Sequence, residues 1–319
     1  PVLALTLAAL LVPSSLLLGE GKGVIPGPTN GFPANPAKGG KSCGQCHGSF
    51  PNSRGVLSFS LTGPRSIQVG TKIRAGLTIS SIVSGSKGGF NMETDKGTFG
   101  PVGNTRANST FDMLTHSDSQ TRSWSFDFAS KSTGLVQWWI VGNTVNGDGR
   151  NGGDSWCWYH HTPALGLSGF PYRLFVNDTQ VFPYGQGCDG ENGIVPILGS
   201  AANATLGKTL KVEAHNLPPL TAALFMMGSS DSQWGVLKLP FDLGLLGMTG
   251  CKLYASPDFF FAAATTGTGI GNGSASIGLP LPNNPVYKGA QLYFQALVID
   301  KNANKFGLSA TGAIKTLVQ

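Results

Sequence analysis

Two cysteines and a histidine lie within five residues of one another in the segment SCGQCHGSF, residues 42–50. They are Cys43, Cys46 and His47, in a chain of 319 residues that has only five cysteines and five histidines. The spacing Cys-x-x-Cys-His is the attachment signature of c-type haem, because two thiols can bond to one porphyrin while the adjacent imidazole reaches the iron. The sequence therefore predicts one covalent haem c, with thioether bonds to Cys43 and Cys46 and with His47 as the proximal iron ligand.

The same cluster could instead form a zinc half-site, a redox dithiol or a local disulfide. A zinc site needs a second pair of ligands at similar spacing, and the sequence offers none. A thioredoxin-like dithiol belongs to a βαβ context, which the sequence also lacks. Covalent haem is the interpretation that the motif favours.

The composition indicates a β-rich, turn-rich, exported protein. Charged residues make up 12% of the chain, against a usual share of about 25%, and there are 46 glycines and 20 prolines. The net charge is +6, but the basic residues are scattered singly along the chain. This pattern excludes a nucleic-acid footprint, which requires clustered lysine and arginine.

The N-terminal segment, residues 1–18, carries no charge and consists mostly of leucine, alanine and valine. It resembles the apolar part of an export signal, and Pro13 interrupts it as a membrane helix. We expect an apolar anchor that meets the membrane, or an arm that packs against a neighbouring subunit. Residues 19–40 are rich in glycine and proline and predict an extended linker.

Short apolar runs separated by glycine, serine and asparagine follow from about residue 55 onward. WSFDF places Trp124, Phe126 and Phe128 on one face, and LVQWWIV (135–141) is almost wholly apolar. Such runs predict strands of β-sandwiches. We expect an all-β fold of two Ig-like β-sandwich domains: a haem-bearing domain at 41–165, a connector at 166–185 and a second module at 186–319.

Several segments of the first half resemble, in order, bacterial reelin-like (Reeler, choice-of-anchor V) domains of secreted proteins. These segments are SCGQCHGSF, GGFNMETDKGTFG, LTHSDSQTRSWSFDFAS and VQWWIVGNTVNGDGRNGGDS, and the resemblance covers about residues 40–160. It implies an immunoglobulin-like sandwich with a haem motif near its start. The second half resembles a β-sandwich module of planctomycete-type exported proteins, which implies structure or an interaction surface and no activity.

The second iron ligand has five candidates, which are His116, His160, His161, Met92 and Met113. We choose His116, because a loop at a sandwich end could lay it over a haem tethered at the start of the domain. The resemblance adds that such domains carry a Thr-His pair at this place. The pair His160 and His161 is the runner-up.

The remaining cysteines and one acidic loop could hold further sites. Export permits a disulfide between Cys188 and Cys251, and we expect Cys157 to be a buried free thiol beside two tryptophans. The loop NGDGRNGGD offers three oxygen ligands for calcium, which are Asn146, Asp148 and Asp154. It lacks a bidentate glutamate, so a glycine-asparagine hairpin is favoured over a calcium site.

The sequence therefore predicts an exported monohaem cytochrome that carries electrons outside the cytoplasm, as a subunit of a larger assembly with a redox partner protein. It shows no hydrolytic motif, so an electron carrier is favoured over an enzyme. One alternative is a structural or adhesive surface or filament protein with an ancillary haem. Another is a haem protein with an open iron site, peroxidase-like or ligand-sensing.

Overall fold

The structure is a computed structural model that describes residues 34–35, 43, 47, 57–110, 112–150, 153–159 and 170–319. The described chain is built from strands, and the prediction of an all-β fold is confirmed. The expected N-terminal arm at 1–18 lies outside the described residues, as do most of the linker at 19–40, Cys46, His160 and His161.

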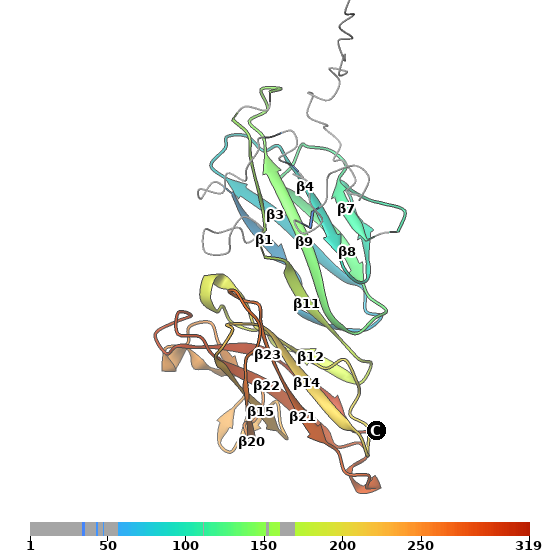
Figure 1. Cartoon of the computed structure of the whole chain (residues 1–319), viewed down its shortest axis with the longest axis vertical. Coiled ribbons are helices and arrows are strands. Elements are labelled where there is room, and N and C mark those ends of the chain that lie inside the picture. The colour runs from blue at the N-terminus through green and yellow to red at the C-terminus, as the bar shows by residue number, and fades with distance from the viewer. Residues whose placement is uncertain are drawn as a thin grey trace, which may run out of the picture.

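The first group of strands forms two sheets (Figure 1). A four-stranded sheet has the order β1-β3-β8-β5, and a larger sheet has the order β2-β11-β9-β4-β7-β6, with β10 added to β9. The bounds are β1 Leu57–Thr62, β2 Ser66–Gln68, β3 Ile73–Ser81, β4 Gly88–Thr94, β5 Thr98–Pro101, β6 Thr105–Ala107, β7 Met113–His116, β8 Ser123–Ala129, β9 Gly134–Thr144, β10 Ser155–Trp158 and β11 Tyr172–Asn177.

The two sheets pack face to face over one apolar core, as in a β-sandwich. Alternation along each strand selects the side chains that enter this core. Trp124, Phe126 and Phe128 enter it from β8, and Val136 and Trp138 enter it from β9. The predicted inward face of WSFDF is therefore confirmed.

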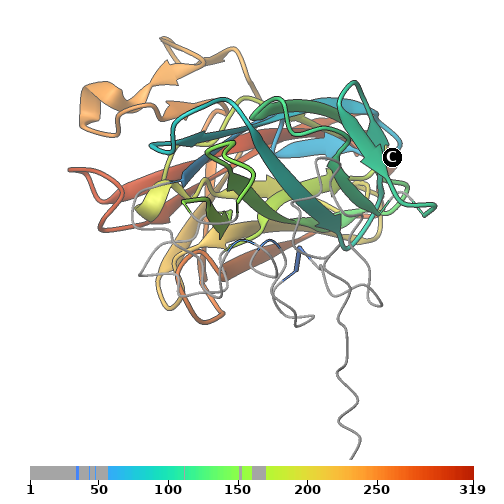
Figure 2. The ribbon, with the colours of Figure 1, turned by 90° about the horizontal axis from the view of Figure 1, so that it is seen from above.

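The second group also forms two sheets around a core of its own. A five-stranded sheet has the order β12-β23-β22-β15-β20, a three-stranded sheet has the order β13-β14-β21, and two short hairpins, β16–β17 and β18–β19, stand out to one side (Figure 2). The bounds are β12 Val181–Tyr184, β13 Ile197–Gly199, β14 Thr209–Leu217, β15 Ala222–Gly228, β16 Gln233–Trp234, β17 Leu237–Lys238, β18 Phe241–Asp242, β19 Lys252–Leu253, β20 Phe259–Ala264, β21 Gly273–Pro280, β22 Gln291–Ile299 and β23 Leu308–Leu317, with 3-10 helices η4 Glu191–Gly193, η5 Leu243–Leu246 and η6 Pro285–Tyr287.

The segment at 166–185, expected as a connector, contributes a strand to each group. Strand β11 pairs with β9 and β2 of the first group, whereas β12 pairs with β23 of the second. The chain passes from one group to the other between Asn177 and Val181. Both strands are short and apolar, and only their partners, far away in sequence, show that they belong to sheets.

The two groups touch through side chains of β11 and of the loops that face it. The Arg173 guanidinium donates hydrogen bonds to Asn216 Oδ1 at 3.3 Å, to the carbonyl oxygen of Gly271 at 3.0 Å and to Asn272 Oδ1 at 2.8 Å. Phe175 stacks on His215 with ring centroids 5.7 Å apart. These contacts join β11 to β14 and to the loop before β21.

The predicted disulfide between Cys188 and Cys251 is present. It joins the segment after β12 to the chain just before β19, next to a small apolar cluster that includes Met226, Leu239 and Met248. Cys157 is a buried free thiol, as expected, and burial raises its pKa to about 12.

Candidate haem site

The face of the larger sheet that points away from the first core is covered and apolar. Because Val136, Trp138 and Ile140 point into the core, Trp139 and Val141 of β9 point to the opposite side. Trp156 and Trp158 of β10 join them, with their ring centroids 5.1 Å apart. We call these four residues, Trp139, Val141, Trp156 and Trp158, the tryptophan face.

The N-terminal part of the chain lies against this face. Ala34 and Cys43 pack into the same apolar cluster as the tryptophan face. The backbone N–H groups of Ala34 and Asn35 both donate to Glu93 Oε1, the latter at 3.0 Å, and Glu93 is 2% exposed. A buried carboxylate of β4 thus helps to hold the segment that carries the haem motif.

One backbone hydrogen bond joins the two described residues of the haem motif. The His47 N–H donates to the carbonyl oxygen of Cys43 at 3.0 Å, an i to i+4 bond. Residues four apart in such a turn lie on the same side of it. Cys43 and His47 are therefore presented together, as the motif requires, while Cys46 lies outside the described residues.

His47 is held by an acidic side chain 107 residues further along the chain. Its Nδ1 lies 2.7 Å from Asp154 Oδ2, and the other oxygen of this carboxylate accepts a hydrogen bond from the Asn146 N–H at 3.1 Å. The side chain of Asp154 is 2% exposed and that of His47 is 15% exposed. Since Nδ1 is engaged, Nε2 is the nitrogen that could bind iron.

His116, at the end of β7, is held in a similar way by backbone. Its Nδ1 lies 3.1 Å from both the nitrogen and the oxygen of Phe90, where β7 stops pairing with β4. Its ring also lies against Gly89: a Cβ at that position would be 2.4 Å from Cε1 and 2.7 Å from Nε2. When Nδ1 donates to the Phe90 carbonyl oxygen, Nε2 is the nitrogen left for a ligand; when Nδ1 accepts the Phe90 N–H, Nε2 carries the proton.

The pKa of His116 is lower than the usual value for a histidine. Burial is the largest cause and lowers the pKa of His116. Arg106 and His47 lower this pKa further, whereas the hydrogen bond to Phe90 and the charge of Asp118 raise it.

The two methionines that were candidates for the second iron ligand are both buried. Met92 is fully buried in the first core, between the two sheets. Met113 is 6% exposed. His160 and His161 lie outside the described residues, so their candidacy stays a prediction.

Residues 146–150 of the acidic loop form two tight turns. Asn146 Oδ1 accepts the Asp148 N–H at 3.1 Å, and Asp148 Oδ1 accepts the Arg150 N–H at 2.8 Å. These are the local bonds expected of an asparagine- and glycine-rich hairpin. Within the part of the chain that the structure describes, no three His, Cys, Asp or Glu side chains are grouped to hold a metal ion.

The residues around the motif fit a haem. The tryptophan face supplies flat apolar surface beside Cys43, and Gly89 leaves room for the imidazole of His116. The Trp158 Nε1–H is buried and finds no acceptor among the described residues, so a polar group of a bound haem could accept it. Sequence reasoning named His47 and His116 but missed Asp154 as the partner of His47, because its loop resembled a cation site.

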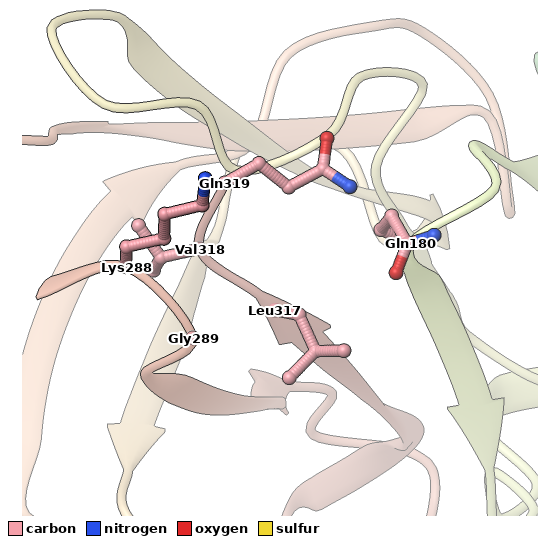
Figure 3. A pocket seen from close by; sticks show the side chains of 6 residues that line it. All are labelled: Gln180, Lys288, Gly289, Leu317, Val318 and Gln319. Carbon is pink, nitrogen blue, oxygen red and sulfur yellow. The ribbon is translucent and has the colours of Figure 1, made fainter.

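A shallow depression lies elsewhere, in the second group of strands (Figure 3). It is lined by Gln180, Lys288, Gly289, Leu317, Val318 and Gln319. This lining has no histidine, cysteine or carboxylate side chain, and we assign it no chemistry.

No protein-family model matches the chain, and no curated protein is similar enough to match it. Among the described residues there is no helix with the length and apolar character needed to cross a membrane.

Proposed function

We propose that the protein is an exported c-type cytochrome that carries single electrons. One observation supports this most directly: Nδ1 of His47 lies within hydrogen-bonding distance of Asp154 Oδ2 and Nδ1 of His116 within that distance of the Phe90 carbonyl oxygen, so a neutral ring that donates there has Nε2 for iron. A ligating histidine ordinarily donates its other ring N–H in this way. A haem bound there supplies reversible one-electron chemistry at iron.

The two histidines favour an electron carrier over an enzyme. Imidazoles on both sides of the iron would occupy both axial positions, whereas a peroxidase or a ligand sensor needs one of them open. The protein contributes attachment at the motif, two oriented imidazoles and burial against the tryptophan face. These are the features by which a protein sets a haem potential.

The disulfide supports export. Disulfides persist in oxidising compartments, and the bond between Cys188 and Cys251 belongs to that chemistry. We propose a periplasmic, cell-surface or extracellular location and a redox partner protein or neighbouring subunits. The resemblance of residues 40–160 to reelin-like domains remains a prediction, and the proposed function does not rest on it.

A structural or adhesive role with an ancillary haem is the second candidate. Strand β20 is an edge strand of the five-stranded sheet, and its residues Phe259 and Phe260 are 60% and 55% exposed. An unpaired edge with exposed aromatic side chains can add a strand or an apolar surface from another protein. This candidate predicts that assembly continues when the haem is absent.

The test is production of the chain in a host that matures c-type cytochromes, followed by absorption spectroscopy of both redox states. We expect haem that stays attached under denaturing conditions and a sharp low-spin α-band on reduction. Replacing Cys43 and Cys46 by serine should abolish attachment, whereas the control Cys157→Ser should retain it. Wild-type protein without covalent haem would reject the cytochrome, and assembly by that protein would support the second candidate.

A further inference from the structure

We propose that Asp154 is the positioning residue of the proximal histidine, fixing the His47 ring and biasing the iron toward its oxidised state. The inference rests on the proposed function. It starts from a buried carboxylate that contacts the motif histidine directly, at 2.7 Å between Oδ2 and Nδ1.

The geometry decides which nitrogen of His47 carries the proton. An ionised carboxylate only accepts hydrogen bonds, so Nδ1 is the donor in this contact and Nε2 is the nitrogen left for a metal. Without Asp154 either tautomer of the imidazole would be available. The carboxylate therefore selects the form of His47 that can bind iron.

Asp154 is itself fixed by its own loop. Oδ1 accepts the Asn146 N–H at 3.1 Å, and the next residue, Ser155, begins β10 of the larger sheet. The carboxylate is thus held between the turn at Asn146 and a paired strand. Through it, His47 of the haem motif is joined to the sheet that carries the tryptophan face.

The same contact has an electronic consequence. A carboxylate on the second ring nitrogen makes the imidazole a stronger base toward metal. A stronger base and a nearby negative charge both stabilise ferric iron more than ferrous iron. The reductant that supplies this protein must therefore be a stronger one than a neutral proximal histidine would require.

The experiment compares Asp154→Asn with a matched control, Glu93→Gln. Both carboxylates are buried, both hold the N-terminal part of the chain, and only Asp154 touches His47. We expect Asp154→Asn to keep covalent haem and to shift the reduction equilibrium by about tenfold toward the ferrous form, which is about 59 mV for one electron. Glu93→Gln should shift it clearly less.

The outcomes separate this inference from the proposed function. Wild-type protein without covalent haem rejects the cytochrome itself. Covalent haem with equal potentials in wild type and Asp154→Asn, or equal shifts in both variants, rejects the role of Asp154 alone. If Asp154→Asn does not fold, nitrogen-15 NMR of the reduced wild-type protein decides: a slowly exchanging His47 Nδ1–H supports the contact, and a rapidly exchanging one overturns it.

Discussion

The imidazole of His116 is fixed on two sides. Phe90 backbone engages Nδ1 at 3.1 Å, and Gly89 lies under the ring. A histidine that only filled a solvated turn would need neither constraint. The other described histidine outside the motif, His215, stacks on Phe175 in the contact between the two groups of strands.

Replacing His116 by alanine should open one axial position of the iron. We expect covalent haem to remain, since Cys43 and Cys46 are untouched, while the low-spin spectrum becomes high-spin and responds to carbon monoxide. His215→Ala is the matched control and should keep the low-spin spectrum. An unchanged spectrum in His116→Ala would make the pair His160 and His161 the first choice.

Adding one methyl group at Gly89 should disturb the same site without removing any ligand. The new Cβ would lie 2.4 Å from Cε1 of His116, so the ring must move and lose its bond to Phe90. Overpacking of this kind costs about 1–3 kcal/mol of folding free energy.

Absorption spectra and urea unfolding of Gly89→Ala would test this, and we expect a partly high-spin haem and a lower urea midpoint. The control Gly278→Ala adds its methyl group on β21, where it meets only the Thr209 methyl at 3.1 Å. A Gly89→Ala protein with wild-type spectrum and midpoint would contradict the close packing.

At the scale of elements, the disulfide secures the two hairpins at the side of the second group. Cys188 and Cys251 are 63 residues apart in sequence, and closing a loop of that length is worth about 4 kcal/mol in the chain-entropy model. We expect replacement of both cysteines by alanine to lower the free energy of unfolding by about 2–5 kcal/mol. Urea unfolding with and without reductant measures this.

The wild-type protein serves as its own control for the disulfide. A reductant should lower its midpoint toward that of the double variant, while the variant itself should not respond. Equal midpoints for all four samples would show that the bond adds nothing to stability. Cys157→Ala should keep the response to reductant, because Cys157 is outside the bond.

Strand elements were predictable where one chain segment carries its own pattern. WSFDF became β8 and LVQWWIV lies within β9, because alternation marks the first and continuous apolarity marks the second. The apolar run LVQWWIV did not indicate that two of its residues, Trp139 and Val141, face away from the core and line the candidate haem site. An apolar run does not show which of its two faces is covered by core and which by another segment.

The contacts that complete the candidate site could not be predicted, because they join distant segments. His47 meets Asp154 across 107 residues, and Gly89 meets the ring of His116 only because β4 pairs with β7. The motif itself was recognisable because haem attachment requires its ligands within five residues. Asp154 has no such requirement, and its loop has the composition of any tight turn.

At the scale of the whole molecule, the two groups of strands meet through a small, partly polar contact (Figure 1). Arg173 crosses it with three hydrogen bonds, and burial lowers the pKa of this guanidinium to about 10. Next to it, Phe175 packs on His215 of β14. A half-buried histidine beside an arginine should make the stability of the molecule sensitive to acid.

The pH dependence of unfolding tests this contact. Burial lowers the pKa of His215 from 6.5 to about 4; Glu213 opposes the shift, whereas Arg173 and Lys211 reinforce it. Between these two pH values His215 is protonated in the unfolded chain and neutral in the folded chain. The free energy of unfolding therefore falls as the pH drops from about 6.5 to 4. The full difference corresponds to about 3 kcal/mol, and solvent screening of the half-buried ring reduces it to about 1–2 kcal/mol.

His215→Gln removes the titrating ring and keeps a neutral polar side chain at the contact. Carboxylates such as Asp300 titrate in both proteins, so their contribution cancels when the two urea midpoints are subtracted at each pH. We expect the wild type to be the more stable protein at pH 7 and to lose that advantage by pH 4.5. If the two midpoints fall in parallel over this range, His215 is not held neutral by the contact, and the two groups of strands are not coupled through it.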